Sequence, residues 1–372
     1  MGDAEAQAVA NTIHSGWVAQ GPRVSEFEKK FAEYIGVNEA IAVSSCTAGL
    51  HLALHVHGIG PGDEVIVPSF SFIATTNSVI YTGASPVFAD VDEVTGNLDV
   101  PELDRVLGPQ TKAVMVVHQA GVPAELNQIR AWCKARDLLL IEDAACAIGS
   151  RYESSLIGSD SHLAVFSFHP RKLLTTGEGG MMVTDSSEIA TRLRQLREHG
   201  MSVSAADRHA SGGTTVEAYL ETGFNYRMTD MQAAVGLVQL EKIDRIVRRR
   251  RELAETYHRL LDDLDAVRAV TDPTCGATNY QSFWVELQDD MVDRGHVMSF
   301  MAERGISTRR GIMAAHLEPA CSQFASKPLP VTEHLTRRTM ILPLYHQMTS
   351  DDQVHVIQAL SDALTEQLWP KS

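Results

Sequence analysis

Residues 138–146 read LLLIEDAAC, and residues 164–180 read AVFSFHPRKLLTTGEGG. Each stretch begins with a short run of apolar residues, which is typical of a buried strand, and continues into residues that indicate a turn. Three similar runs precede them, at residues 64–69, 86–92 and 112–118. Stretches with helical spacing, such as residues 125–137, separate several of these runs. This alternation predicts an α/β protein whose mostly parallel sheet lies between helices.

The pattern extends toward both ends of the chain. Residues 22–35 carry apolar side chains at helical spacing, and residues 39–45 follow as a strand. A helical pattern without proline runs from Asp230 to Leu264, long enough to bridge two domains. Beyond it, strand-like residues 281–287 and helix-like residues 296–305 and 351–367 suit a smaller α+β domain. For a chain of 372 residues we expect a large domain over residues 1–245 and a smaller C-terminal domain over residues 246–372.

Composition argues against several classes of protein. The net charge of −15 opposes binding to nucleic acid. Five scattered cysteines without a CxxC spacing suggest neither a disulfide framework nor a zinc site, and they fit a reducing cytoplasm. The first residues lack the apolar core of a signal peptide, and no later stretch reaches the 18 apolar residues of a membrane span. We therefore expect a cytoplasmic protein that binds neither nucleic acid nor membrane, and we expect no metal.

Three features follow predicted strands, where open α/β sheets build their ligand sites. SSCTAG at residues 44–49 opens a helix, so its backbone N–H groups and the Thr47 hydroxyl could hold a phosphate. Asp143 ends an apolar run and needs a partner if it is buried, such as a protonated pyridine nitrogen. Lys172 precedes the glycine-rich TTGEGG turn and would be a nucleophile in a desolvated pocket. Together these features fit pyridoxal phosphate.

Each feature also has an ordinary structural explanation. SSCTAG could be a simple helix N-cap, Asp143 could cap a turn or pair with an arginine, and Lys172 could be a solvated surface charge. Arg171 would point away from Lys172 if the segment is extended. Only the three features in combination favour the cofactor.

From about Ser15 onward the sequence resembles the DegT-type sugar aminotransferases, a branch of the fold type I pyridoxal-phosphate enzymes. The segments that carry this resemblance are SGWVAQGPRVSEFE (15–28), SSCTAGLHLAL (44–54), GPGDEVIVPSFSFIATTN (60–77), PVFADVD (86–92), IEDAACAIGS (141–150), FSFHPRKLLTTGEGG (166–180) and GFNYRMTDMQAAVGLVQLEKID (223–244). It implies a fold type I aminotransferase-like architecture. It also implies a homodimer whose active sites are shared between subunits.

The resemblance implies a role for each matching position. Lys172 matches the lysine that holds the cofactor as a Schiff base and then moves the proton, and Asp143 matches the partner of the pyridine nitrogen. The remaining matches are Cys46 through its backbone and Thr47 and Ser167 through their hydroxyls, all at the phosphate, Phe72 on the ring, and Asn225 at the phosphate of the neighbouring subunit. Cys146 departs from the family, which usually has His or Gln near the cofactor's phenolic oxygen. A thiol is a weak donor, so the change could tune the proton affinity of the Schiff base or merely make room.

Other polar residues leave their roles open. His169 could contact substrate or simply pack. Arg309, Arg310 and His316 fall where the family's C-terminal domain lines the substrate cleft, but they could equally be exposed loop residues. His51, His55 and His57 are more consistent with a packed helix than with a metal site. The run Arg248 to Arg251 predicts a solvated helix.

The reaction that these matches imply transfers an amino group from glutamate or glutamine to a keto sugar in amino-sugar biosynthesis, and we expect that keto sugar to be nucleotide-linked. A cyclitol ketone is an alternative acceptor. A regulator that keeps the fold and binds the cofactor without turnover is an alternative of another class, although the intact Lys172 and Asp143 count against it.

Overall fold

The computed structural model describes residues 1–203 and 216–368 and contains a large sheet with the strand order β1-β9-β8-β5-β4-β2-β3. Strands β8, β5, β4, β2 and β3 are parallel to one another, whereas β9 is antiparallel to both β8 and β1. The strands are β1 (Glu39–Val43), β2 (Glu64–Pro68), β3 (Ser85–Ala89), β4 (Thr111–Val117), β5 (Leu139–Asp143), β8 (Ala164–Ser167) and β9 (Gly180–Thr184). The predicted mostly parallel sheet is confirmed.

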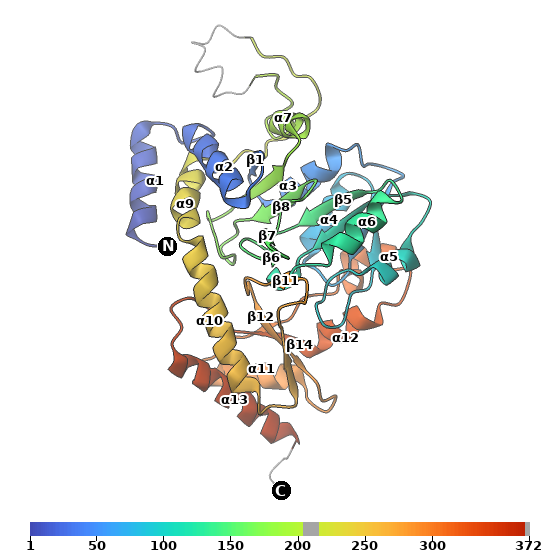
Figure 1. Cartoon of the computed structure of the whole chain (residues 1–372), viewed down its shortest axis with the longest axis vertical. Helices are drawn as coiled ribbons and strands as arrows, with labels where there is room; N and C mark the ends of the chain where they lie inside the picture. Colours follow the sequence, from blue (N-terminus) through green and yellow to red (C-terminus); the bar gives the residue numbers. More distant parts are fainter. Residues whose placement is uncertain (204–215, 369–372) are drawn as a thin grey trace.

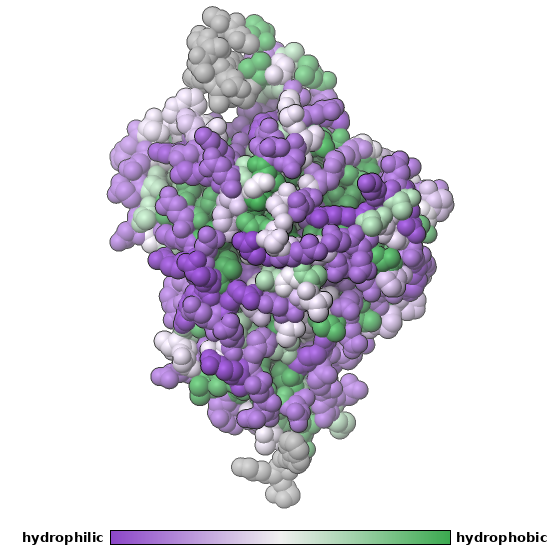
Figure 2. Space-filling view, viewed as in Figure 1, coloured by the Kyte–Doolittle hydropathy of each residue, from purple (hydrophilic) through white to green (hydrophobic). Residues whose placement is uncertain are grey.

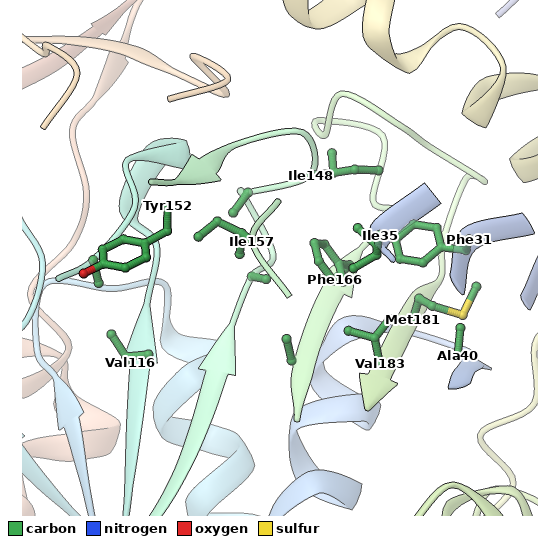
Figure 3. Close-up of a cluster of buried hydrophobic side chains, with 14 of the residues drawn as sticks. Phe31, Ile35, Ala40, Val116, Ile148, Tyr152, Ile157, Phe166, Met181 and Val183 are labelled. Carbon is green, nitrogen blue, oxygen red and sulfur yellow. The ribbon is translucent and has the colours of Figure 1, made fainter. Parts of the chain in front are cut away.

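Helices cover both faces of this sheet because its strands are apolar on both sides. Val114 and Val116 of β4 face one apolar cluster, while Met115 between them faces another. The first cluster draws on α2 (Pro22–Ile35), α5 (Val100–Val106), α6 (Leu126–Lys134) and α9 (Asp230–Leu240), and the second on α3 (Cys46–His55), α4 (Ile73–Tyr81) and α7 (Ser187–Leu196). Figure 3 shows part of the first cluster, where Phe31 packs edge-on against Phe166 at 5.2 Å between ring centroids.

A second, antiparallel sheet lies toward the C-terminal end, with the order β10-β12-β14-β13. Its strands are β10 (Val267–Ala269), β12 (Phe283–Leu287), β13 (Arg309–Arg310) and β14 (Thr339–Leu342), and the helices around it are α11 (Arg294–Glu303), α12 (Pro330–Arg338) and α13 (Ser350–Leu368). Figure 1 shows α10 (Ile243–Leu261) running from beside α9 to α11 and α13. This arrangement agrees with the smaller α+β part expected from the sequence.

The remaining elements are short or peripheral. They are α1 (Asp3–Ser15), a three-stranded sheet of β6 (Arg151–Tyr152), β7 (Ser155–Leu156) and β11 (Gly276–Ala277), and the 3-10 helices η1 (Gln119–Gly121), η2 (Ala315–Leu317) and η3 (Pro319–Phe324). Within residues 1–203 and 216–368 no helix is both long and apolar enough to cross a membrane. The face in Figure 2 is mostly hydrophilic.

Two expectations about the long helical stretch need correction. The stretch is two helices, because α9 ends at Leu240 and α10 begins at Ile243. The basic run is not uniformly solvated, since Arg250 is only 8% exposed. Its guanidinium donates to the carbonyls of Tyr280, Gln281 and Leu344 at 2.7–2.9 Å, and burial lowers its pKa to about 10. A domain boundary between residues 245 and 246 stays a prediction.

Asp230 connects α9 to the start of α2. Its buried carboxylate accepts hydrogen bonds from the backbone N–H groups of Gly21, Arg23 and Val24 at 2.8–3.1 Å. These amides belong to the first turn of α2 and the residue before it, where no intrahelical partner exists. One side chain therefore caps a helix that is about 200 residues away in the sequence.

We predict that Asp230→Ala lowers the free energy of unfolding by about 2–3 kcal/mol, because three backbone donors lose a charged acceptor. Urea denaturation followed by circular dichroism measures the change. Asp263→Ala, at an exposed position, is the matched control and should change stability by less than about 0.5 kcal/mol. Equal effects of the two substitutions would contradict the capping role.

Candidate active site

A cavity of about 470 Å³ opens at the carboxyl edge of the parallel strands. Its lining comes from segments that directly follow β1, β2, β4, β5 and β8, which all end at this edge. The residues that line it are Ser45, Cys46, Thr47, Leu50, Ser71, Phe72, Ala74, Thr75, Val117, Gln119, Asp143, Ala145, Cys146, Ser167, His169, Arg171, Lys172 and Glu178. The fold thus gathers residues far apart in the sequence at the place where parallel α/β sheets build ligand sites.

Asp143 is the last residue of β5 and is only 5% exposed. Its carboxylate accepts hydrogen bonds from the Thr75 hydroxyl at 2.9 Å and from the backbone N–H of Ala145 at 3.1 Å. Burial raises the pKa of Asp143 above its usual range, although these two donors act in the opposite direction. A carboxylate has about four acceptor positions, so it retains room for a further donor, and a cation beside it would favour its charged form.

Lys172 lies in the loop between β8 and β9, in a turn closed by its own backbone N–H to the carbonyl of His169 at 2.9 Å. Its Nζ donates to the sulfur of Cys146 at 3.0 Å. Burial lowers the pKa of this amine, but the sulfur of Cys146 and the carboxylate of Asp143 contribute to an opposite effect that is larger, so the pKa is raised. Because the segment is a turn and not extended, Arg171 also lines the cavity.

The start of α3 supplies the polar end of the cavity. Ser45 is the N-cap residue, and its hydroxyl accepts from the backbone N–H of Ala48 at 3.1 Å. The amides of Cys46 and Thr47 belong to the first helical turn and have no intrahelical carbonyl to bind. Ser167, at the end of β8, lines the same cavity. A Cβ on Gly180 would lie 2.7 Å from the nitrogen of Cys46, so glycine is required for this close approach.

Of the twelve residues expected to contact cofactor or substrate, the structure brings eight together in this cavity: Cys46, Thr47, Phe72, Asp143, Cys146, Ser167, His169 and Lys172. Asn225 lies outside this cavity and accepts from Arg227 at 3.1 Å. Arg309 and Arg310 are exposed on β13. His316 is buried, with its Nδ1 2.6 Å from the Ser69 hydroxyl.

Sequence reasoning missed several residues of the cavity. Gln119 lies just after the carboxyl end of β4. Because open α/β sheets bind ligands at the carboxyl ends of their strands, its place in the sequence could have predicted it as a site residue. Thr75 lies inside α4, away from any strand end, so no sequence pattern marks it as a site residue. Only the fold brings its hydroxyl to Asp143. Glu178, in the TTGEGG turn, places a carboxylate oxygen 4.0 Å from Nε2 of His169.

His51 and His57 belong to packed surroundings elsewhere. His51 is buried with its ring 4.9 Å from that of Phe224, and burial beside His55 lowers its pKa to about 4. Nδ1 of His57 lies 2.8 Å from the carbonyl of Ala53. In the described part of the chain, the residues Glu93, Glu286 and His334 form a group with the spacing of metal ligands, but Arg268 already pairs with Glu286 there.

A mostly parallel sheet with a buried aspartate and a lysine at its carboxyl edge is the arrangement of a fold type I aminotransferase. A model of the DegT/DnrJ/EryC1/StrS aminotransferase family matches residues 1–361. The chain therefore belongs to this family and is an aminotransferase.

Three relatives illustrate the similarity. The chain is 39% identical over 368 residues to the spore coat polysaccharide biosynthesis protein SpsC of Bacillus subtilis (strain 168), with 97% of this chain and 95% of SpsC covered. The structure of the aminotransferase TlmJ from Streptoalloteichus hindustanus matches with a TM-score of 0.90 and 35% identity, over 98% of this chain and 97% of TlmJ. S. venezuelae DesV, solved in complex with a ketimine intermediate, matches with a TM-score of 0.89 and 33% identity, over 96% of this chain and 93% of DesV.

We predict that Asp143→Asn stabilises the cofactor-free protein near pH 8. Since burial raises the pKa of Asp143, the unfolded state loses its proton first, and folding stability falls as the pH rises from the ordinary value of 3.8 to the folded one. Asparagine carries no charge, so the variant does not lose this stability as the pH rises. The gain in melting temperature should therefore be present at pH 8 and disappear as the pH falls toward that ordinary value.

Differential scanning fluorimetry across this pH range measures the effect. Asp290→Asn, at an exposed position, is the control and should leave the melting temperature unchanged at every pH. A melting temperature of Asp143→Asn that is lower than that of the wild type at pH 8 would contradict the claim that the buried charge is costly.

Proposed function

We propose that this aminotransferase uses pyridoxal 5'-phosphate to move an amino group from glutamate or glutamine to a keto sugar, with a nucleotide-linked sugar as the preferred acceptor. The observation that carries this proposal is the placement of Lys172 and the buried Asp143 in one cavity whose polar end is a helix N-terminus. Each of these three features suits a different part of the cofactor.

The phosphate would bind at the start of α3, where backbone N–H groups and the helix dipole attract an anion. Thr47 and Ser167 would donate their hydroxyls there, and Cys46 its backbone N–H. The positively charged pyridine nitrogen would pair with Asp143, and Phe72, which is 69% exposed at the cavity, would cover the ring. When bound, the cofactor supplies an electron sink for the carbon that gains or loses the amino group.

Lys172 would hold the cofactor through its Nζ and, once displaced by the amino donor, carry the proton between carbon and nitrogen. The 3.0 Å contact with Cys146 places a sulfur at this amine, at the position where the family resemblance implies His or Gln. Burial lowers the pKa of Lys172, and the contact with Cys146 is the largest of the opposing effects that leave this pKa raised, with Asp143 contributing less.

Polar residues of the cavity lining and the named relatives support a keto sugar as the amino acceptor. His169, Arg171 and Glu178 place polar groups on this lining, which suits a hydroxylated substrate. SpsC is named for polysaccharide biosynthesis, which fits amino-sugar formation. Arg309, Arg310 and His316 remain proposed contacts for the nucleotide or sugar. We also propose a homodimer in which Asn225 reaches the phosphate site of the partner subunit, and a cytoplasmic location.

We predict that the purified protein with pyridoxal phosphate shows a visible absorption band that decreases on addition of glutamate. Lys172→Ala should bind the cofactor without the lysine-linked band, because among the described residues Lys172 is the only lysine that lines the cavity. Absorption spectra of both proteins before and after glutamate measure this. The control is Lys327→Ala, at an exposed position that is not part of this lining, which should behave as the wild type.

The amino acceptor is then tested with keto sugars linked to UDP, GDP or TDP and with inosose, each added to the glutamate-treated protein. Return of the band with a nucleotide-linked sugar supports the proposal, whereas return with inosose alone indicates the cyclitol alternative. A protein that binds the cofactor but exchanges no amino group with any donor would be the non-catalytic regulator, and the proposed reaction would be wrong.

A further inference from the structure

The side chain of Gln281 holds the backbone on both sides of Lys172. Its Nε2 donates to the carbonyl of Arg171 at 2.7 Å, and its Oε1 accepts from the backbone N–H of Leu173 at 3.2 Å. One amide group therefore occupies the carbonyl before the lysine and the N–H after it. Such a paired contact restricts rotation of the backbone at Lys172 in the way that a neighbouring strand would.

Gln281 is itself held by the residues around it. Its backbone N–H donates to Oδ1 of Asn279 at 2.7 Å, and its carbonyl accepts from the guanidinium of Arg250 at 2.9 Å. Arg250 also binds the carbonyl of Tyr280, a residue with a left-handed backbone of φ 50°. A non-glycine residue adopts this conformation only when its surroundings hold it there. The segment 279–281 is thus fixed from α10.

The same segment holds the loop that carries Cys146. Asn279 is fully buried, and its Nδ2 donates to the carbonyls of Cys146 and Ile148, both at 2.8 Å. The loops of Lys172 and Cys146 therefore share one anchor, and between them lies the 3.0 Å contact from Nζ to sulfur. The hydroxyl of Ser150, in the loop that follows Cys146, also accepts from the backbone N–H of Asn279 at 3.1 Å.

We propose that Gln281 is a positioning residue for the aminotransferase reaction: through its two hydrogen bonds to the Lys172 loop it sets where the lysine amine stands relative to Cys146 and Asp143. The catalytic part of this inference rests on the proposed function. The two hydrogen bonds from Gln281 to the Lys172 loop do not depend on that function. Arg250 and Asn279 support Gln281 from behind, so the position of Lys172 depends on residues that follow the large sheet in the sequence.

The test compares two variants with a matched control. Gln281→Met removes both hydrogen bonds at similar length, whereas Gln281→Glu keeps the acceptor for the Leu173 N–H and loses the donor to Arg171. Gln288→Met replaces an exposed glutamine just after β12 and is the control. Melting temperatures establish that each protein is folded.

Hydrogen exchange of the Leu173 amide in the cofactor-free protein tests the contact without relying on activity. We predict exchange at least about tenfold faster in Gln281→Met than in the wild type, with Gln281→Glu and Gln288→Met remaining near the wild type. Unchanged exchange in Gln281→Met would overturn the anchoring contact. Fast exchange in Gln281→Glu as well would show that the acceptor is not what protects this amide.

Steady-state kinetics then test the positioning role. We expect kcat of Gln281→Met to fall on the order of 10- to 100-fold, the usual effect of a small misplacement of a catalytic group, with KM for glutamate changed less than about twofold. Faster exchange with unchanged kcat would overturn the positioning role and leave Gln281 as structural. Absence of amino transfer in the wild type would instead refute the proposed function, while the exchange result would still decide the contact.

Discussion

Burying a charged carboxylate costs free energy unless hydrogen-bond donors and cations surround it. Asp143, the buried last residue of β5, is such a carboxylate. Thr75 of α4 and the backbone N–H of Ala145 each donate a hydrogen bond to its carboxylate. Strand β5 lies between β4 and β8, and residues at the carboxyl ends of all three strands line one cavity with Asp143. The cavity, the Lys172 loop and the start of α3 are arranged around that edge. The pKa of Asp143 stays raised by burial, which leaves the site suited to a cationic partner.

Much of the fold and of the candidate site could be predicted because both depend on local patterns. Apolar runs that alternate with helical spacing define the sheet, and parallel strands bring the residues after them to one edge. Asp143 and Ser167 end strands, and Cys46 and Thr47 begin the helix after β1, so their meeting follows from topology. The resemblance to aminotransferases then assigned them roles that the geometry is compatible with.

The features that could not be predicted depend on contacts between residues far apart in the sequence, and such contacts leave no local sequence pattern. A glutamine at position 281 has ordinary surroundings in the sequence, yet it binds on both sides of a lysine more than 100 positions earlier. Arg250 belongs to a basic run that predicts solvent-exposed side chains. Its side chain is instead buried and donates to three backbone carbonyls. The helical pattern of residues 230–264 contains no proline, so its break between Leu240 and Ile243 could not be foreseen from composition.

We propose that Asp143 is the charged partner of the cofactor's ring nitrogen. The most direct measurement is the ¹⁵N NMR shift of ring-labelled pyridoxal phosphate bound to the wild type and to Asp143→Asn. This pairing predicts the shift of a protonated pyridine nitrogen in the wild type and of an unprotonated one in the variant at the same pH. An unprotonated nitrogen in the wild type, or the same shift in both proteins, would contradict it.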